Sequence, residues 1–125
     1  MDKNANLTIA EEKLAELIWR EEPLSSPTLV ALAENELAWK KSTTYTVLKK
    51  LCNKGIFKNE NATVSAMLTQ DDLIAQQSRQ YIENTFGGSL PQFIAAFMGN
   101  SKLSPKQAAE IRQLIEQYEG DDANG

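Results

Sequence analysis

The chain contains no histidine and only one cysteine, Cys52, so several kinds of catalytic and metal site cannot be built from it. A Ser-His-Asp or Cys-His arrangement needs an imidazole as its general base. Zinc centres are usually made of histidine and cysteine, and here one cysteine would have to combine with carboxylates alone. An intramolecular disulfide is also excluded, which fits a reducing compartment. We therefore expect no enzyme activity, no metal and no other cofactor.

Phosphate-binding loops and membrane segments are also absent from the sequence. It contains neither G-x-x-x-x-G-K-[ST] nor G-x-G-x-x-G, the glycine patterns that hold nucleotide phosphates. No apolar run approaches the roughly 20 residues that a membrane-spanning helix needs. Residues 1–6 are polar, unlike a signal peptide. We therefore expect a cytoplasmic protein with no membrane insertion.

Positive charge is scarce overall but concentrated in one segment. The net charge is −4, which taken alone argues against binding to nucleic acid. Between Leu37 and Asn59, however, lysine is the only charged residue type, at positions Lys40, Lys41, Lys49, Lys50, Lys54 and Lys58. The field at a contact surface matters more than the total charge, so this segment is a candidate contact with phosphate. The alternative is an ordinary solvated helix face.

Capping residues predict two helices at the start of the chain. Thr8 followed by Glu11 is the pattern of a capping box, and it opens a helix that Pro23 ends. Ser26 followed by Pro27 indicates the N-cap and the first position of a second helix. Both helices carry apolar residues at three- and four-residue spacing, which predicts one buried face on each.

A third helix is expected to start between Lys40 and Ser42, and Ser42 is the better N-cap by its side chain. The helix should run to Lys54, because Gly55 can adopt the left-handed conformation that ends a helix. One face is predicted to be buried, and its residues are Thr44, Val47, Leu48 and Leu51.

Two short strand candidates follow the third helix, at residues 56–58 and 64–68, and residues 59–62 are expected to form the turn between them. Three helices followed by a hairpin are the winged helix-turn-helix arrangement. The sequence therefore predicts a winged-helix domain over residues 1–70. The hairpin is the wing, and its polar residues Asn61, Thr63 and Ser65 should add little affinity for DNA.

The remaining chain is predicted to be helical, which makes the fold mainly α with one small β-hairpin. Thr69 with Asp72 caps a fourth helix, and the Gly87-Gly88 pair separates it from a fifth. Ser104 with the proline that follows begins a sixth.

Three helices of this size bury their apolar residues poorly alone, and pairing with a second copy would cover them. Packing within one chain is the alternative. We expect residues 71–119 to form a helical dimerisation domain and residues 120–125 to be a disordered tail. The candidate dimerisation residues are Leu90, Phe93, Ile94, Phe97, Met98, Ile111 and Ile115.

The exposed face of the third helix offers the chemistry that a DNA major groove requires. Hydroxyl side chains can reach base edges, and lysines can hold phosphates. Backbone N–H groups at the helix start also favour a phosphate. The candidate DNA-binding residues are Lys40, Lys41, Ser42, Thr43, Tyr45, Thr46, Lys49 and Lys50.

Four sequence segments together resemble the penicillinase-repressor family, the BlaI/MecI/CopY group. They are L-T-I-A-E-E-K-L-A-E-L-I-W (7–19), A-W-K-K-S-T-T-Y-T-V-L-K-K-L (38–51), F-G-G-S-L (86–90) and K-L-S (102–104). The resemblance covers about residues 7–118 and rests on the order and spacing of the segments. It implies a winged-helix domain, a helical dimerisation domain and a homodimer that binds a palindromic operator to block transcription.

The resemblance also implies particular residues and partners. The contacts of the family's reading helix fall on Thr43, Tyr45, Thr46, Lys49 and Lys50. In relatives with a resistance role, a membrane sensor-transducer metalloprotease system leads to cleavage of the repressor. The corresponding position here lies between Ala96 and Phe97. The cysteine cluster of the copper-responsive members has no counterpart in this chain.

Two functions of different classes remain open on the sequence. The lysine segment and the Thr-Tyr-Thr face favour a DNA-binding repressor. The short wing and the acidic net charge favour a winged-helix protein-interaction module with weak or no DNA binding.

Overall fold

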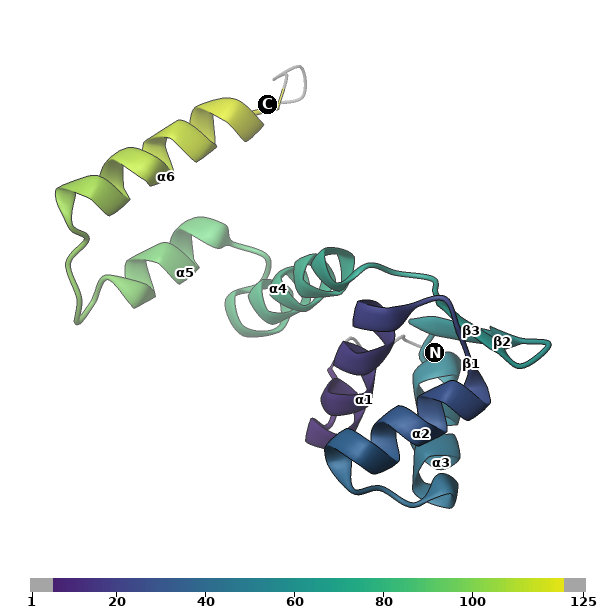
Figure 1. Ribbon diagram of the computed structural model, residues 1–125. Coiled ribbons are helices and arrows are strands. Elements are labelled where there is room, and N and C mark those ends of the chain that lie inside the picture. The colour runs from purple at the N-terminus through teal and green to yellow at the C-terminus, as the bar shows by residue number, and fades with distance from the viewer. Residues whose placement is uncertain (1–5, 121–125) are drawn as a thin grey trace. The chain divides into compact units, whose positions relative to one another are not determined.

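The computed structural model describes residues 6–120, which form two compact units that meet at the Tyr81–Ile82 bond (Figure 1). The predicted tail beyond Gly120 lies outside the described residues. The mainly helical chain with its small antiparallel sheet confirms the predicted fold class. The elements are α1 (Ile9–Glu21), β1 (Leu24–Ser25), α2 (Ser26–Leu37), α3 (Lys41–Asn53), β2 (Phe57–Glu60), β3 (Thr63–Ala66), α4 (Gln70–Phe86), α5 (Leu90–Phe97) and α6 (Pro105–Tyr118).

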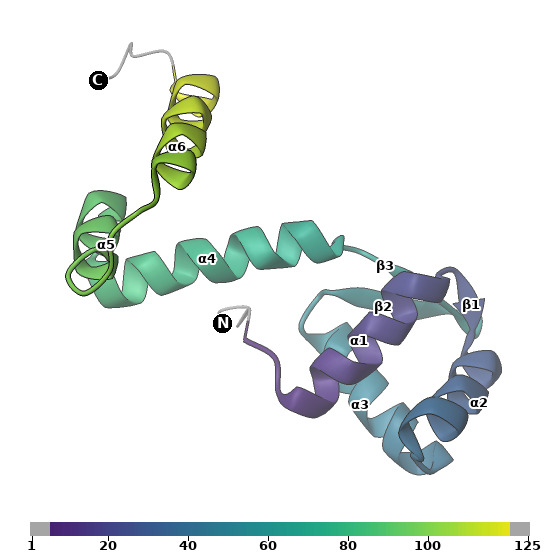
Figure 2. The ribbon, with the colours of Figure 1, turned by 60° about the vertical axis from the view of Figure 1, so that its left-hand side comes forward.

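The predicted capping box of α1 is confirmed. The Thr8 hydroxyl accepts a hydrogen bond from the Glu11 backbone N–H at 3.1 Å, and the Thr8 N–H donates to the Glu11 carboxylate at 2.9 Å. The helix ends at Glu21, two residues before Pro23. The buried face of α1 then packs against α2 and α3, and Figures 1 and 2 show these three helices gathered beside the sheet.

The predicted N-cap of α2 is wrong by one residue. Ser25 occupies that position, and its hydroxyl accepts from the Thr28 N–H at 3.1 Å. Ser26 is already the first residue of the helix, and its N–H donates to the carbonyl of Ala62 in the hairpin at 2.8 Å. This hydrogen bond ties the start of α2 to the hairpin. The helix ends at Leu37, and the capping residue Ala38 has a left-handed φ of 59°.

The preference for Ser42 as the N-cap of α3 is also wrong. Lys40 takes that position in an extended conformation, and no side chain caps the helix start. The reason lies one turn further on, at the fully buried Thr44. Its N–H and its hydroxyl both donate to the Lys40 carbonyl, at 3.1 Å and 3.3 Å. Burial of this hydroxyl without a partner would be costly, so the helix begins where the Lys40 carbonyl can accept.

The sheet contains one strand that the sequence did not predict. The strands are antiparallel in the order β1-β3-β2, and the two-residue β1 pairs Leu24 with Val64. The hairpin was predicted, but its turn is shorter than expected, because β2 extends to Glu60 and β3 begins at Thr63. Asn61 and Ala62 both have positive φ, at 53° and 60°. Two such residues close a hairpin with the twist of its strands, so two residues suffice.

The hairpin is attached to α1 by an aromatic pair. Phe57 on β2 is 1% exposed, and its ring centroid lies 5.1 Å from that of Trp19. The Trp19 indole N–H donates to the Leu68 carbonyl at 2.9 Å, which holds the chain just after the hairpin. The position of the wing on the helices therefore depends on buried apolar contacts as well as on backbone hydrogen bonds.

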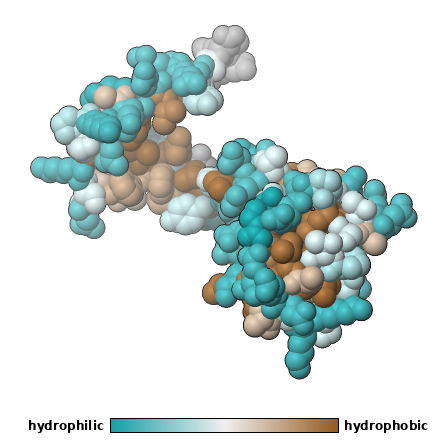
Figure 3. Space-filling view, in the orientation of Figure 1, coloured by the Kyte–Doolittle hydropathy of each residue, from teal (hydrophilic) through white to brown (hydrophobic). Residues whose placement is uncertain are grey.

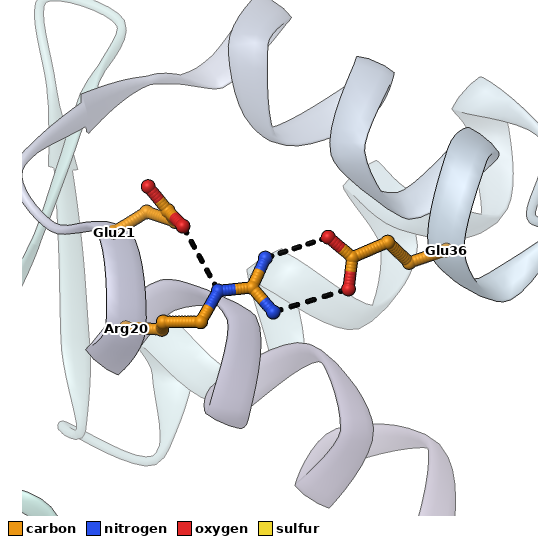
Figure 4. Close-up of polar contacts among 3 residues, drawn as sticks. All are labelled: Arg20, Glu21 and Glu36. Carbon is orange, nitrogen blue, oxygen red and sulfur yellow. Dashed lines mark hydrogen bonds and ion pairs between the residues drawn. The ribbon is translucent and has the colours of Figure 1, made fainter.

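Arg20 joins the ends of α1 and α2 on the surface (Figure 4). Its guanidinium donates to both carboxylate oxygens of Glu36, at 3.1 Å and 2.6 Å, and to Glu21 at 2.9 Å. The hydrogen bond from Arg20 is the main cause that lowers the pKa of Glu36. All three side chains are well exposed, so this network adds little to stability.

The predicted starts of α4 and α6 and the predicted break between α4 and α5 are confirmed. Thr69 and Asp72 exchange the two hydrogen bonds of a capping box at the start of α4, and Gly87 with Gly88 ends that helix at positive φ. Serine hydroxyls cap the other two helices, and these are Ser89 for α5 and Ser104 for α6. Among the described residues, no helix is both long and apolar enough to cross a membrane.

Candidate nucleic-acid interface

Helix α3 buries one face completely and leaves the opposite face in solvent. Thr44, Val47, Leu48 and Leu51 are its buried residues. The helix contacts α1, α2 and β2, which fix its buried side (Figure 2). The structure places most of the candidate DNA-binding residues on the free side, and the exposed ones are Lys40, Lys41, Ser42, Thr43, Thr46, Lys49 and Lys50. We call these seven residues the α3 surface.

Tyr45 differs from the other candidates because it is half-buried. Its hydroxyl donates to the hydroxyl of Ser26 at 3.4 Å, and Ser26 is itself buried at the start of α2. Tyr45 thus links α3 to α2 in addition to bordering the α3 surface. Its ring remains partly accessible, while its hydroxyl already has a partner.

The start of α3 offers backbone donors beside two lysines. Because no side chain caps this helix, the N–H groups of its first turn are not used by a capping oxygen. Lys40 and Lys41 are both exposed at the same end. Free N–H groups and the positive end of the helix dipole attract an anion such as a phosphate.

The structure divides the six lysines of the basic segment into two groups. Lys54 lies 2.6 Å from the Glu11 carboxylate, and Lys58 lies 3.5 Å from Glu60. The other four, which belong to the α3 surface, form no ion pair within residues 6–120. Within this basic segment, the lysines without an ion pair are therefore those at and along α3, and the wing retains little free positive charge.

The ion pair between Lys54 and Glu11 is largely buried. Burial raises the pKa of Glu11, but hydrogen bonds from Lys54 and Thr8 outweigh it, so the pKa lies below its ordinary value. A carboxylate with a lowered pKa stabilises the fold above its unfolded pKa. That contribution is lost as the pH falls through the folded pKa.

Lys54→Met should therefore lower the free energy of unfolding by about 2 kcal/mol near pH 7, because the Glu11 carboxylate keeps its burial and loses its strongest partner. The deficit relative to wild type should be smaller at a second, more acidic pH at which Glu11 is protonated. Urea unfolding at the two pH values measures both effects. Lys13→Met, at an exposed position of α1, is the control. An equal deficit at both pH values would contradict this assignment.

The second unit exposes apolar side chains along α5 and α6. Neither helix has a buried residue. Of the predicted dimerisation residues, Phe93, Ile94 and Ile111 are half-buried, and the others are exposed. In Figure 3 the apolar side chains of this unit gather on the side between α5 and α6. An apolar surface of this kind usually marks an interaction site.

Aromatic rings follow one another at close spacing from the end of α4 along α5. The ring centroids of Phe86 and Phe93 are 5.7 Å apart, and those of Phe93 and Phe97 are 6.4 Å apart. The exposed apolar residues of α6 also include Leu114 and Tyr118, which the candidate set omitted. Leu114 follows Ile111 by three residues and Tyr118 follows Leu114 by four, and this helical spacing is the signal that could have identified them.

Comparison with known proteins gives two matches. Residues 7–117 match the family model described as Penicillinase repressor. The chain is also 23% identical over 120 residues to an uncharacterised 16.5 kDa protein from the ptsI 3′ region of Latilactobacillus sakei. That alignment covers 92% of this chain and 82% of the other protein.

Proposed function

This chain belongs to the penicillinase repressor family, and on that basis we propose that it is a cytoplasmic, homodimeric transcriptional repressor that binds a palindromic operator. The observation that carries the proposal is the α3 surface, where unpaired lysines flank short hydroxyl side chains on one exposed helix face. A major groove admits such a helix, and the acidic net charge of the chain lies outside this surface.

The residues of the α3 surface would have different roles. Lys40 and Lys41 are placed to hold a phosphate together with the N–H groups of the helix start. Lys49 and Lys50 lie further along and suit phosphates on the flanking backbone. Ser42, Thr43 and Thr46 have short hydroxyl side chains that can reach base edges. The ring of Tyr45 would contact DNA from the side of α2.

The second half of the proposal is dimerisation through residues 71–119, with residues 1–70 as the DNA-binding domain. A dimer engages two half-sites, and the second contact is then intramolecular. Separation of the two copies would therefore release the operator. Cleavage between Ala96 and Phe97, by a membrane sensor-transducer metalloprotease system, is one way to achieve it. Both residues are exposed at the end of α5.

A specific observation favours the alternative function, a protein-interaction module with weak or no DNA binding. Lys58 in the wing is already close to Glu60, and the turn residues Asn61 and Ala62 carry no charge. A gel-shift titration at low salt, with DNA from upstream of the protein's own gene, separates the two functions. If the protein is a repressor, it should shift the upstream DNA saturably at protein concentrations that leave random DNA unbound. Equal affinity for both DNAs would contradict it.

Lys50→Ala tests the phosphate contacts. Each phosphate that a protein neutralises changes the slope of log K against log salt by about 0.9. We expect the variant to bind all sequences more weakly and with a flatter slope. Lys106→Ala removes one exposed lysine from α6 and should leave the slope unchanged. An unchanged slope for Lys50→Ala would mean that Lys50 does not contact the phosphate backbone of DNA.

Thr46→Ala tests base reading. Thr46 is exposed in the middle of α3, where a short side chain allows close approach to the groove floor. Loss of a base contact costs roughly 1–3 kcal/mol on the operator and little on random DNA. Parallel titrations with the two DNAs measure the difference, and Thr85→Ala at an exposed position of α4 is the control. Equal losses on operator and random DNA would mean that Thr46 reads no base.

A further inference from the structure

A hollow of about 240 Å³ lies between α1 and the first half of α4 and shares no residue with the α3 surface. Its lining residues are Leu7, Glu12, Glu16, Trp19, Gln70, Leu73, Ile74 and Gln77. The lining residues lie at helical spacing on two helices. Glu12, Glu16 and Trp19 share one face of α1. The residues from α4 share one face of that helix, and they are Gln70, Leu73, Ile74 and Gln77. All of these residues belong to the first unit.

Apolar and polar residues share the lining of the hollow, and Trp19 adds an aromatic ring. Leu73 is buried, while Leu7 and Trp19 are half-buried and Ile74 is exposed. The Trp19 indole N–H already donates to the Leu68 carbonyl. The ring can therefore offer its π surface to a ligand but no further hydrogen-bond donor.

The rim of the hollow carries negative charge from two glutamates. Glu12 and Glu16 are exposed and lie one helical turn apart, where like charges repel. Among residues 6–120, no lysine or arginine lines the hollow. Neither carboxylate has an ion-pair partner in the described part of the chain, whereas the neighbouring Glu11 is paired with Lys54. A bound cation would relieve this repulsion, and an anion would increase it.

We propose that this hollow binds a small organic cation with an apolar body, of the arylalkylammonium class. The ammonium group would lie between the Glu12 and Glu16 carboxylates, and the apolar body would pack against Trp19, Leu73 and Ile74. A cation near an aromatic face gains further attraction from the ring. The volume is below the usual range for drug-sized ligands, which limits the occupant to about one ring.

The position of the hollow also suggests a regulatory use, and this part rests on the proposed function. Helix α4 is the element that continues from the first unit into the second. A ligand held by both α1 and α4 restrains how α4 moves relative to α1. If operator binding requires a particular arrangement of α4, ligand and operator must affect each other's affinity equally.

Ligand binding can be tested without DNA. In a Trp39→Phe background the remaining tryptophan is Trp19, so its emission reports directly on the hollow. Phenethylammonium should change this emission saturably near pH 7. The neutral analogue 2-phenylethanol should bind at least roughly tenfold more weakly, and the anion phenylacetate more weakly still.

Charge variants complete the test. Glu12→Gln combined with Glu16→Gln should weaken phenethylammonium binding roughly tenfold or more, while circular dichroism shows the same helix content. Glu34→Gln combined with Glu119→Gln removes the same charge from exposed positions outside the hollow and should have no effect. The proposal is overturned if the alcohol binds as well as the ammonium, or if the first pair of substitutions has no effect. The proposal is also overturned if phenethylammonium gives no saturable change in Trp19 emission. That result would be expected if a second copy of the chain fills the hollow.

Discussion

Phe97→Asp is expected to produce a monomer that keeps a folded winged helix and loses operator binding. Phe97 is 56% exposed at the end of α5, and its ring continues the aromatic series from Phe93. In the proposed dimer this ring is covered by the partner copy. An aspartate there would bury an unpaired charge, which costs several kcal/mol.

The loss of DNA binding follows from the loss of the second half-site contact. Linked contacts can raise affinity by roughly 10² to 10⁴ over a single contact, and a monomer forfeits that gain. Sedimentation of the variant gives its oligomeric state, and a gel shift on the operator gives its affinity. Thermal unfolding followed by tryptophan fluorescence should show an intact first unit, because both tryptophans lie in that unit.

Gln92→Glu provides the matched control for Phe97→Asp. It adds the same charge to α5 at an exposed polar position, and it should leave the dimer and the operator affinity unchanged. A Phe97→Asp variant that stays dimeric would place Phe97 outside the interface. A monomer that still binds the full operator tightly would refute the proposed coupling between dimerisation and repression.

Phe57→Ala should lower the free energy of unfolding of the first unit by about 3–5 kcal/mol, the usual range for a buried phenylalanine. Phe57 is almost fully buried and packs against Trp19, so truncation leaves a cavity between the hairpin and α1. Small domains have only about 5–15 kcal/mol of stability in total. The variant should therefore be largely unfolded at temperatures that wild type tolerates, and it should lose operator binding for that reason.

Urea unfolding followed by tryptophan emission measures this effect, since Trp19 contacts the substituted residue. Phe57→Leu is the control, because it keeps most of the apolar volume and should cost less than about 1.5 kcal/mol. A loss below about 1 kcal/mol for Phe57→Ala would mean that the hairpin is not held by this aromatic contact.

Several helix boundaries could be predicted because the interactions that determine them are local. Thr8 caps α1 through a residue only three positions away, and Thr69 and Ser104 cap their helices in the same way. Gly87 and Gly88 can adopt positive φ without a steric cost, so the end of α4 was also visible in the sequence. The buried and exposed faces of α3 follow from helical periodicity alone.

The features that could not be predicted depend on residues far apart in the chain. Strand β1 is only two residues long and exists because β3 supplies its hydrogen-bonding partner. The start of α2 is tied to the hairpin by the hydrogen bond from the Ser26 N–H to the Ala62 carbonyl. No pattern within a single helix contains that information.

The same distinction applies to the candidate interface. The sequence alone showed that positive charge gathers between Leu37 and Asn59 and that hydroxyl side chains lie among the lysines. Only the tertiary structure decided which lysines remain free, because Lys54 finds its partner Glu11 43 residues earlier in the chain. Periodicity assigns a residue to a face of its own helix, whereas an ion pair or a buried hydroxyl requires atoms that folding brings together from separate elements.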